Sequence, residues 1–222
     1  MTLKNRTVSA THGLKSVVKD SPSELAFAKH LKKSFTNKEI ASIYSNYCDG
    51  LSDYDLMMRR IIWKALAKKI GHGLKIGVGV RFQHLETLSL GNNVTVGDFV
   101  HIQGRHDGKA SFGDKCWIGS QSFIDARCLK ISENVGLGPS SKILGSVHTG
   151  FPINVPIIET DLEIKPIFVD KDADIGVGAI ILPGIKIGKG AIVGAGSVVT
   201  KSVNAFEIVG GVPARVLKKR KG

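Results

Sequence analysis

Aliphatic residues recur at every sixth position over residues 169–204. The residue that opens each hexad is apolar, and these residues are Val169, Ile175, Ile181, Ile187, Val193 and Val199. The fifth position holds a small or slim residue, in the order Ala173, Ala179, Ile185, Ala191, Ser197 and Val203. Neither the 3.6-residue period of a helix nor the two-residue alternation of a strand produces this pattern. A strict six-residue repeat is typical of a parallel β-helix, in which short strands and tight corners stack into coils.

The same register extends toward the N-terminus, with extra residues between coils. Its apolar heads are Ile70, Ile76 and Phe82, then Leu90, Val96 and Ile102, then Phe112, Ile118 and Ile124, then Ile131, Leu137 and Ile143. Three hexads complete one coil of a three-sided prism, so we expect the first and fifth residues to point inward. Glycines in the second and fourth places suit corners, where φ can be positive. Short insertions are predicted at residues 88–89, 108–111 and 130, and a long one at residues 149–168.

The first 69 residues carry helical periodicity instead. Residues 21–35, 37–48 and 52–69 are predicted to form three helices, the first with Pro22 in its opening turn and the third with a capping-box pattern at Ser52 and Asp55. Residues 1–19 are polar and predict a loosely held arm. The chain is therefore predicted to be mainly β, with a helical region (1–69), a β-helix (70–204, with the inserted loop 149–168) and a C-terminal cap with a basic tail (205–222).

The third predicted helix has two apolar faces and a set of cations. The larger face contains Tyr54, Met58, Ile61, Ile62, Ala65 and Leu66, and the smaller contains Leu56, Trp63 and Ala67. Two faces imply two packing partners, the base of the solenoid and a neighbouring subunit. The cations are Arg59, Arg60, Lys64, Lys68 and Lys69, which would form either a solvated face or a peripheral contact with an anionic membrane.

Composition limits the compartment and the class of partner. The sequence contains no apolar run long enough to span a bilayer, and its first residues lack the apolar core of a secretory signal. Three cysteines make no disulfide framework, so we expect a cytoplasmic location. The net charge of +12 favours anionic partners, which include nucleic acid, anionic membranes and phosphorylated small molecules. Charge alone does not choose among these classes.

Three features together resemble one enzyme family. They are the hexads, the long insertion after His148, and two C-terminal segments, residues 194–201 (GAGSVVTK) and 211–215 (GVPAR). This combination resembles the hexapeptide-repeat acyltransferases, in the branch of galactoside, maltose, xenobiotic and polysaccharide O-acetyltransferases. The resemblance implies a left-handed β-helix, which is an exception to the usual right-handed crossover rule. It also implies a homotrimer with active sites between adjacent prisms, and acetyl-CoA as the acyl donor.

His148 is the candidate catalytic residue. It closes the last hexad before the long insertion, where the resembling enzymes carry a catalytic histidine. Acetyl transfer to an alcohol needs a base for the hydroxyl proton, and imidazole titrates near neutral pH. The resemblance implies direct attack on the thioester without an acyl-enzyme. The base needs an acceptor on its second nitrogen, for which Asp125, Asn134 or a backbone carbonyl would serve. A histidine that only satisfies a loop corner is the structural alternative.

The candidate donor site lies in the last coils. Ala195, Gly196 and Ser197 would let a narrow pantetheine arm approach the backbone, and Thr200 and Lys201 follow at the next corner. Arg215 and Lys218 could meet the CoA phosphates. Many relatives carry Trp where this chain has Asp174, so contacts with the thioester arm are expected to differ. The alternative is that these glycines serve only corner geometry and the basic tail is solvated.

Other reactive side chains suggest different classes of site. Cys116 and Cys128 fall in the fifth hexad place and are predicted to be core residues. His84, His101 and His106 could form a three-histidine zinc site, as in carbonic anhydrases of the same fold. Since the C-terminal segments resemble acyltransferases, we expect no metal. The Gly-x-Gly patterns belong to the repeat rather than to a strand–helix nucleotide site. We also expect no nucleic-acid partner.

The sequence therefore predicts a cytoplasmic, trimeric, acetyl-CoA-dependent O-acetyltransferase with His148 as general base. Its acceptor would be a sugar or nucleotide-sugar hydroxyl in the biosynthesis of surface polysaccharide or lipopolysaccharide. One alternative is an N-acetyltransferase of a nucleotide-linked amino sugar. Others are a metal-dependent hydratase of the gamma carbonic anhydrase type and a non-catalytic solenoid.

Overall fold

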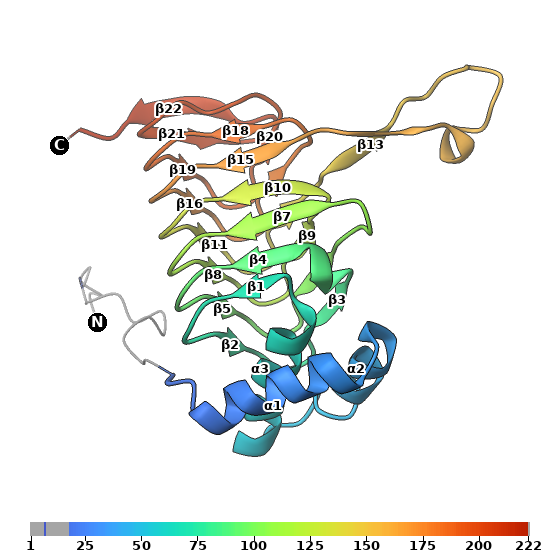
Figure 1. The fold of residues 1–222 in the computed structure, drawn as a ribbon. Coiled ribbons are helices and arrows are strands. Elements are labelled where there is room, and N and C mark those ends of the chain that lie inside the picture. Colours follow the sequence, from blue (N-terminus) through green and yellow to red (C-terminus); the bar gives the residue numbers. More distant parts are fainter. Residues whose placement is uncertain (1–6, 8–17, 222) are drawn as a thin grey trace, which may run out of the picture.

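The fold is a three-sided prism of stacked parallel strands closed at one end by helices (Figure 1). The computed structural model describes residue 7 and residues 18–221, so most of the predicted arm at 1–19 lies outside the described residues. Face A contains β1 (Lys69–Ile70), β4 (Leu88–Leu90), β7 (Lys109–Phe112), β10 (Cys128–Ile131), β15 (Ile167–Val169) and β18 (Lys186–Ile187). Face B contains β2 (Lys75–Ile76), β5 (Thr95–Val96), β8 (Trp117–Ile118), β11 (Gly136–Leu137), β16 (Asp174–Ile175), β19 (Ile192–Val193), β21 (Glu207–Gly210) and β22 (Arg215–Lys219). Face C contains β3 (Arg81–Gln83), β6 (His101–Gln103), β9 (Phe123–Asp125), β12 (Lys142–Ile143), β17 (Ile180–Ile181) and β20 (Val198–Val199).

Every predicted hexad head stacks on the head one coil away. On face A the aligned heads are Ile70, Leu90, Phe112, Ile131, Val169 and Ile187. On face B they are Ile76, Val96, Ile118, Leu137, Ile175 and Val193. On face C they are Phe82, Ile102, Ile124, Ile143, Ile181 and Val199. The predicted fold class, a left-handed parallel β-helix with an α-helical N-terminal region, is confirmed.

The fifth hexad position also points into the prism, with one correction. Ala173, Ala179, Ala191 and Ser197 are fully or almost fully buried, as is Cys116. Cys128 is only half-buried, and the inward side chain two places before Ile131 is Leu129. The extra residue of this coil therefore lies before Leu129, in the corner, and not at position 130. For the same reason Leu88 and Ala110, placed in insertions by the sequence, are core residues of face A.

Two glycines of one corner show why the repeat needs glycine twice. Gly178, in the fourth place, has φ +67°. Gly176, in the second place, lies against the next coil, where an added Cβ would be 2.5 Å from the backbone nitrogen of Ala195. At this corner the positive φ of the fourth place favours glycine, and the close approach at the second place needs its missing side chain. Other corners adopt positive φ without glycine, among them the corner at Asn134.

Three helices close the N-terminal end, as predicted. They are α1 (Pro22–Ser34), α2 (Asn37–Tyr44) and α3 (Asp53–Leu66). Ser21 caps α1, and capping boxes begin α2 and α3. Most of both apolar faces of α3 packs within the chain, and Tyr54 and Leu56 are the exposed members. Ile62 and Trp63 are fully buried, and the Trp63 ring contacts Phe82 edge-on at 5.4 Å. The helical region therefore serves as a base plate for the first coil.

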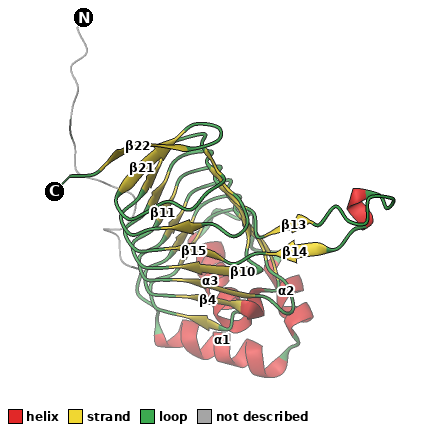
Figure 2. Ribbon diagram, turned by 90° about the horizontal axis from the view of Figure 1, so that it is seen from above, coloured by secondary structure: helices red, strands yellow, loops and turns green. Residues whose placement is uncertain are grey.

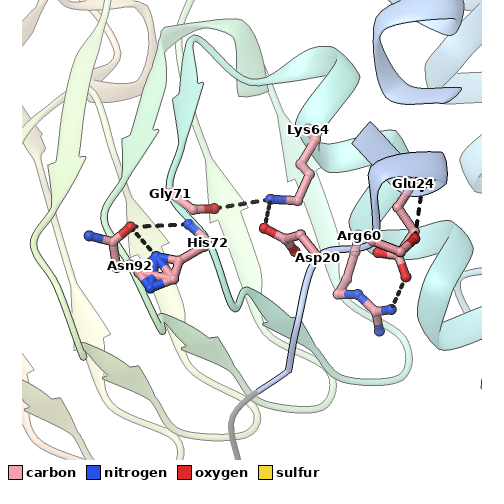
Figure 3. A network of polar contacts seen from close by, with 8 residues as sticks. Asp20, Glu24, Arg60, Lys64, Gly71, His72 and Asn92 are labelled. Carbon is pink, nitrogen blue, oxygen red and sulfur yellow. Dashed lines mark hydrogen bonds and ion pairs between the residues drawn. The ribbon is translucent and has the colours of Figure 1, made fainter. Parts of the chain in front are cut away.

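The cations of α3 bind groups within the protein (Figure 3). Lys64 Nζ lies 2.9 Å from Asp20 and donates to the carbonyl oxygen of Gly71 at 3.0 Å. Arg60 pairs with Glu24 at 2.9 Å. Arg59 is fully buried and donates to three carbonyl oxygens, at Tyr47, Gly50 and Ile76. Three of the five cations are therefore occupied inside the fold and only Lys68 and Lys69 are exposed, so the five do not form one solvated face, and a membrane contact stays a prediction.

The other end of the prism extends beyond residue 204. Strand β21 continues face B, with Val209 stacked on Val193, and β22 returns antiparallel beside it. The segment predicted to be only a cap therefore adds a further level to the β-helix. In addition, β13 (Ser146–His148) and β14 (Leu162–Ile164) form a separate two-stranded ribbon that projects from the prism (Figure 2). The insertion thus runs between Ile143 and Ile167, and Ile167 and Phe168 belong to face A.

Candidate active site

His148 lies at the end of β13, where the ribbon leaves the prism. Antiparallel pairing sets His148 opposite Leu162, and the Thr149 amide donates to the carbonyl oxygen of Asp161 at 2.8 Å. Beyond these bonds the ribbon turns through a short 3₁₀ segment, Ile157–Glu159. The histidine is therefore held on paired strands rather than on a free loop. It lies at the corner between faces C and A.

The ring of His148 is oriented by a backbone carbonyl. Its Nδ1 lies 3.0 Å from the carbonyl oxygen of Thr160, and the side chain is half-buried. A carbonyl oxygen can only accept, so Nδ1 carries the proton in this bond and Nε2 is the unprotonated nitrogen of the neutral ring. Nε2 can then take a proton from an acceptor. Thr160 is itself buried, and its hydroxyl donates to the carbonyl oxygen of Ile157 at 2.6 Å.

Neither side chain suggested as the orienting partner fills that role. Asp125 accepts a hydrogen bond from Ser146 at 3.2 Å and pairs with Arg127, whose Nε lies 3.2 Å from it. Asn134 donates to Asp172 at 3.1 Å, on the edge between faces A and B. The third possibility, a backbone carbonyl, is the one observed.

The predicted donor residues lie on two edges of face C. Ala195 and Gly196 form the exposed corner between β19 of face B and β20 of face C, and the φ of Gly196 is +65°. Thr200 and Lys201 form the exposed corner between faces C and A, the same edge as His148. The Lys201 corner and the corner from which the ribbon leaves are on the same edge but two coils apart. Lys201 therefore lies about 10 Å from the ribbon root along the prism axis.

Ser197 is part of the core. Its side chain is fully buried and accepts a hydrogen bond from the Gly211 amide at 3.1 Å. Its own amide donates to the carbonyl oxygen of Gly194 at 3.3 Å. Ser197 thus joins the corner to the 211–215 segment, in which Ala214 donates to Val198 at 2.8 Å. A direct contact between the Ser197 side chain and a ligand would require this packing to open.

Lys201 and Arg215 line one shallow cavity of about 250 Å³ at the C-terminal end. Glu207 lines it too, and the pKa of this carboxyl group is lowered, chiefly by hydrogen bonds from the Asn204 side chain and backbone. The cavity thus combines two cations with one carboxylate. Lys218 lies on β22, opposite Ile208, and is exposed. The cations suit a phosphate, whereas Glu207 limits how much negative charge the cavity accepts.

The residues proposed for a metal site do not converge. Among the described residues no group of three potential His, Cys, Asp or Glu ligands lies together. The rings of His84 and His106 are 6.1 Å apart, whereas His101 contacts Phe123 edge-on at 5.5 Å. Burial raises the pKa of the Cys116 thiol to about 11, so this core cysteine is not a nucleophile at neutral pH. Within the part of the chain described, no helix is long and apolar enough to cross a membrane.

The sequence does not indicate which groups surround His148 and the root of the ribbon. The Thr160 carbonyl oxygen has no side-chain signal, and Ser146 and Arg127 meet Asp125 only because successive coils stack. The alternation in residues 146–148 and 162–164 could have suggested a hairpin. Its register would still have been open, because 13 residues separate the two strands. The structure thus defines a class of protein, a β-helix built from six-residue repeats, with an oriented histidine at the root of a projecting ribbon.

Comparison with known proteins agrees with this class. A family described as the hexapeptide repeat of succinyl-transferase matches residues 166–201. A putative acetyltransferase of Schizosaccharomyces pombe is 34% identical over 110 residues, which are 49% of this chain and 52% of that protein. The dTDP-4-amino-4,6-dideoxy-D-glucose acyltransferase of Escherichia coli is 29% identical over 160 residues, 69% of this chain and 82% of that protein. The chain thus spans about half the length of the first relative and about four fifths of the second.

Solved structures show the same fold. AntD, an N-acyltransferase from Bacillus cereus in complex with dTDP and 3-hydroxybutyryl-CoA, has a TM-score of 0.66 and 22% identity, over 73% of this chain and 88% of that one. A hexapeptide-repeat acetyltransferase of Vibrio cholerae complexed with acetyl-CoA has a TM-score of 0.59 and 21% identity, over 90% of this chain and 88% of that one. The chain is thus similar to hexapeptide-repeat acyltransferases and shares their left-handed β-helix fold. The narrower O-acetyltransferase branch stays a prediction.

Proposed function

We propose that this protein is a CoA-dependent acyltransferase whose acceptor is the amino group of a nucleotide-linked sugar. The observation that carries the catalytic part is the 3.0 Å contact between Nδ1 of His148 and the Thr160 carbonyl oxygen, which leaves Nε2 as a base. The acceptor class is supported by the Escherichia coli relative, whose name specifies a dTDP-linked amino sugar. It is also supported by AntD, a structural neighbour with dTDP-4-amino-4,6-dideoxyglucose and CoA.

The proposed reaction is direct acyl transfer. The acceptor nitrogen attacks the thioester carbonyl carbon, the new C–N bond forms, and the C–S bond breaks. His148 Nε2 takes one proton from the attacking nitrogen and delivers it to the departing sulfur, which leaves as the CoA thiol. No other reactant is required. The anionic donor and acceptor both suit the net charge of +12.

The donor would lie along the last coils, between subunits of a homotrimer. Ala195 and Gly196 offer an exposed corner to a narrow pantetheine chain, and Lys201 and Arg215 offer cations to the phosphates. The proposed trimer would also cover the apolar ribbon, whose Phe151, Ile153 and Ile158 are 71%, 88% and 81% exposed in one chain. We also propose a cytoplasmic location and a role in surface-polysaccharide biosynthesis, since CoA thioesters and nucleotide sugars are cytoplasmic metabolites.

O-acetylation of a sugar hydroxyl is the second candidate, because a base of fixed tautomer is the device that hydroxyl attack requires. A hydroxyl group must lose its proton as it attacks, whereas an unprotonated amine attacks with its lone pair and loses its proton afterwards. His148→Ala should therefore reduce turnover of a hydroxyl acceptor by about 100-fold or more and that of an amine acceptor by less. The two functions thus differ in a measurable quantity.

The test measures CoA release from acetyl-CoA with a panel of nucleotide-linked amino sugars, the matching hydroxy sugars and free sugars. His148→Ala is compared with His30→Ala, a substitution of an exposed histidine on α1. We expect the wild type to turn over an amino sugar. His148→Ala should lose this turnover, and His30→Ala should keep it. Turnover with hydroxy sugars alone would replace N-transfer by O-transfer. No turnover and no CoA binding would reject the acyltransferase proposal.

A further inference from the structure

A closed ring of three polar side chains lies at the root of the ribbon. Arg127 Nη1 donates to Ser146 Oγ at 2.7 Å, and Ser146 Oγ donates to Asp125 Oδ2 at 3.2 Å. Arg127 Nε lies 3.2 Å from Asp125 Oδ1, and this ion pair, which lacks hydrogen-bond geometry, completes the ring. The side chains of Asp125 and Arg127 are only 8% and 13% exposed. We propose that these three residues, here called the ribbon clamp, are positioning residues for His148, an inference that rests on the proposed function.

The clamp joins two successive coils at one corner. Asp125 ends β9 of face C, Arg127 follows in the corner, and Ser146 begins β13 of the ribbon. The backbone is packed as closely as the side chains are. A Cβ added at Gly145 would lie 2.9 Å from the carbonyl oxygen of Asp125 and 3.1 Å from its carboxyl carbon. The ribbon therefore starts from a point that is fixed against the coil below it.

Strand periodicity transmits this fixed point to the catalytic ring. Side chains two residues apart in a strand point to the same side, so Ser146 and His148 share one side of β13. A two-stranded ribbon is marginally stable in water by itself. In one chain the ribbon tip is largely exposed, as Ile153 and Ile158 show. The angle at which β13 leaves the prism, and with it the position of His148, is therefore set at the root, while the Thr160 carbonyl orients the ring.

A buried ion pair is a poor device for stability alone. Removing two charges from water offsets most of their mutual attraction, so apolar residues of similar volume would stabilise the corner equally well. Apolar contacts, however, have little directionality. A carboxylate and a guanidinium that both bind one hydroxyl group allow that hydroxyl a single position. Such a network suits a place where the strand must leave the prism at one angle.

The experiment compares Ser146→Ala, which removes the bridging hydroxyl group, with Ser146→Thr, which keeps it. Glu163→Gln is the matched control, because it removes the exposed Lys165 ion pair (2.9 Å) from the same ribbon. With an acceptor that turns over, we expect Ser146→Ala to lower kcat by about 10- to 100-fold, since a small misplacement of a catalytic group has effects of this size. KM for acetyl-CoA should change by less than about twofold, and Ser146→Thr should recover most of kcat.

The hydrogen-exchange rates of backbone amides in the ribbon measure the effect of the ribbon clamp independently of turnover. The amide of Lys165 donates to Gly145 and that of Thr149 to Asp161. We expect both to exchange about tenfold faster in Ser146→Ala, with the amides of β12 and β17 unchanged as the internal reference. The clamp would be overturned if kcat and the amide exchange rates of Ser146→Ala equalled those of the wild type. It would also be overturned if kcat of Ser146→Thr were no higher than that of Ser146→Ala. If the wild type turns over no acceptor, the proposed function fails, and exchange alone decides on the clamp.

Discussion

A single backbone oxygen gives the candidate catalytic residue its chemical direction. The Thr160 carbonyl can only accept, so it fixes the proton of His148 on Nδ1 and leaves Nε2 as the basic nitrogen. This orientation of the ring comes from the register of β13 against β14. His148 faces Leu162, and Thr160 precedes Leu162 by two residues. A base of defined tautomer is thus a consequence of strand pairing, and no neighbouring carboxylate is needed for it.

The two glycines of the Gly176–Gly178 corner allow a prediction at the same scale. Gly176→Ala should lower the free energy of unfolding by about 2–3 kcal/mol, because the new Cβ would lie 2.5 Å from the Ala195 backbone nitrogen in the next coil. Gly178→Ala should lower it by only about 1 kcal/mol, because its φ is +67° but no atom lies within 4 Å.

Urea unfolding of both glycine variants beside the wild type is the measurement. The two variants are matched, since they add the same methyl group to the same corner. A larger loss in Gly178→Ala would mean that backbone conformation, and not the approach of the next coil, limits the repeat at this corner.

Among the elements, α3 is joined to the first coil and to the segment that precedes it by a fully buried cation, Arg59. Arg59 donates to the carbonyl oxygens of Tyr47 and Gly50, both at 2.8 Å, and of Ile76, at 3.2 Å. Arg59→Met should destabilise the protein by about 3 kcal/mol, because it leaves buried carbonyl groups without a partner. Arg59→Lys should not recover this loss, since an ammonium group lacks the fork of donors that reaches three oxygens.

Thermal unfolding followed by tryptophan fluorescence, to which the buried Trp63 and the half-buried Trp117 contribute, tests this prediction. Lys68→Met is the control, because it removes an exposed cation next to the end of the same helix. Equal melting temperatures for Arg59→Met and the wild type would show that apolar packing alone holds α3 to the first coil.

The start of α3 should respond to pH. Hydrogen bonds from the hydroxyl and amide groups of Ser52 hold the pKa of Asp55 below its usual value of 3.8. A carboxyl group whose pKa is lower in the folded state contributes stability above its unfolded pKa and loses it as pH falls through the folded value. The wild type should therefore lose its advantage over Asp55→Asn as the pH falls below about 4.

Melting temperatures of the wild type and Asp55→Asn between pH 3 and pH 7 supply this test. Asp53→Asn is the matched control, since Asp53 lies in the same turn but outside the capping box. A difference between wild type and Asp55→Asn that does not depend on pH would contradict the linkage.

The elements also show what a sequence can predict about such a fold. Hexad heads are predictable because each must face the prism interior, and all of them from Ile70 to Val199 stack as expected. A one-residue insertion between two heads leaves no pattern, and therefore Cys128 was placed in the core instead of Leu129. His148 is a candidate from the sequence because it precedes a long insertion, and its catalytic role stays a prediction. A backbone carbonyl is one of the expected partners, but the sequence does not indicate which one, because a backbone oxygen leaves no trace in residue identity.

For the molecule as a whole, the two parts of the proposed site lie on different edges of the prism. His148 is on the edge between faces C and A, and Ala195 is on the edge between faces B and C. One prism presents these edges on opposite sides of face C, so a single chain does not bring the two corners together. A closed trimer would set the His148 edge of one subunit against the Ala195 edge of the next.

Mixed trimers test this arrangement directly. His148→Ala removes the base, and Ala195→Trp would block the exposed corner where the donor is proposed to lie. Each variant alone should be inactive. If the site is shared between subunits, trimers formed from equal amounts of both should recover about a quarter of wild-type activity, because chance pairs an intact His148 edge with an intact Ala195 edge at that frequency. Mixing the variants after separate assembly is the control and should recover nothing. Inactive mixed trimers, formed in the expected ratio by mass spectrometry, would place both parts of the site within one chain and remove the reason for a trimer.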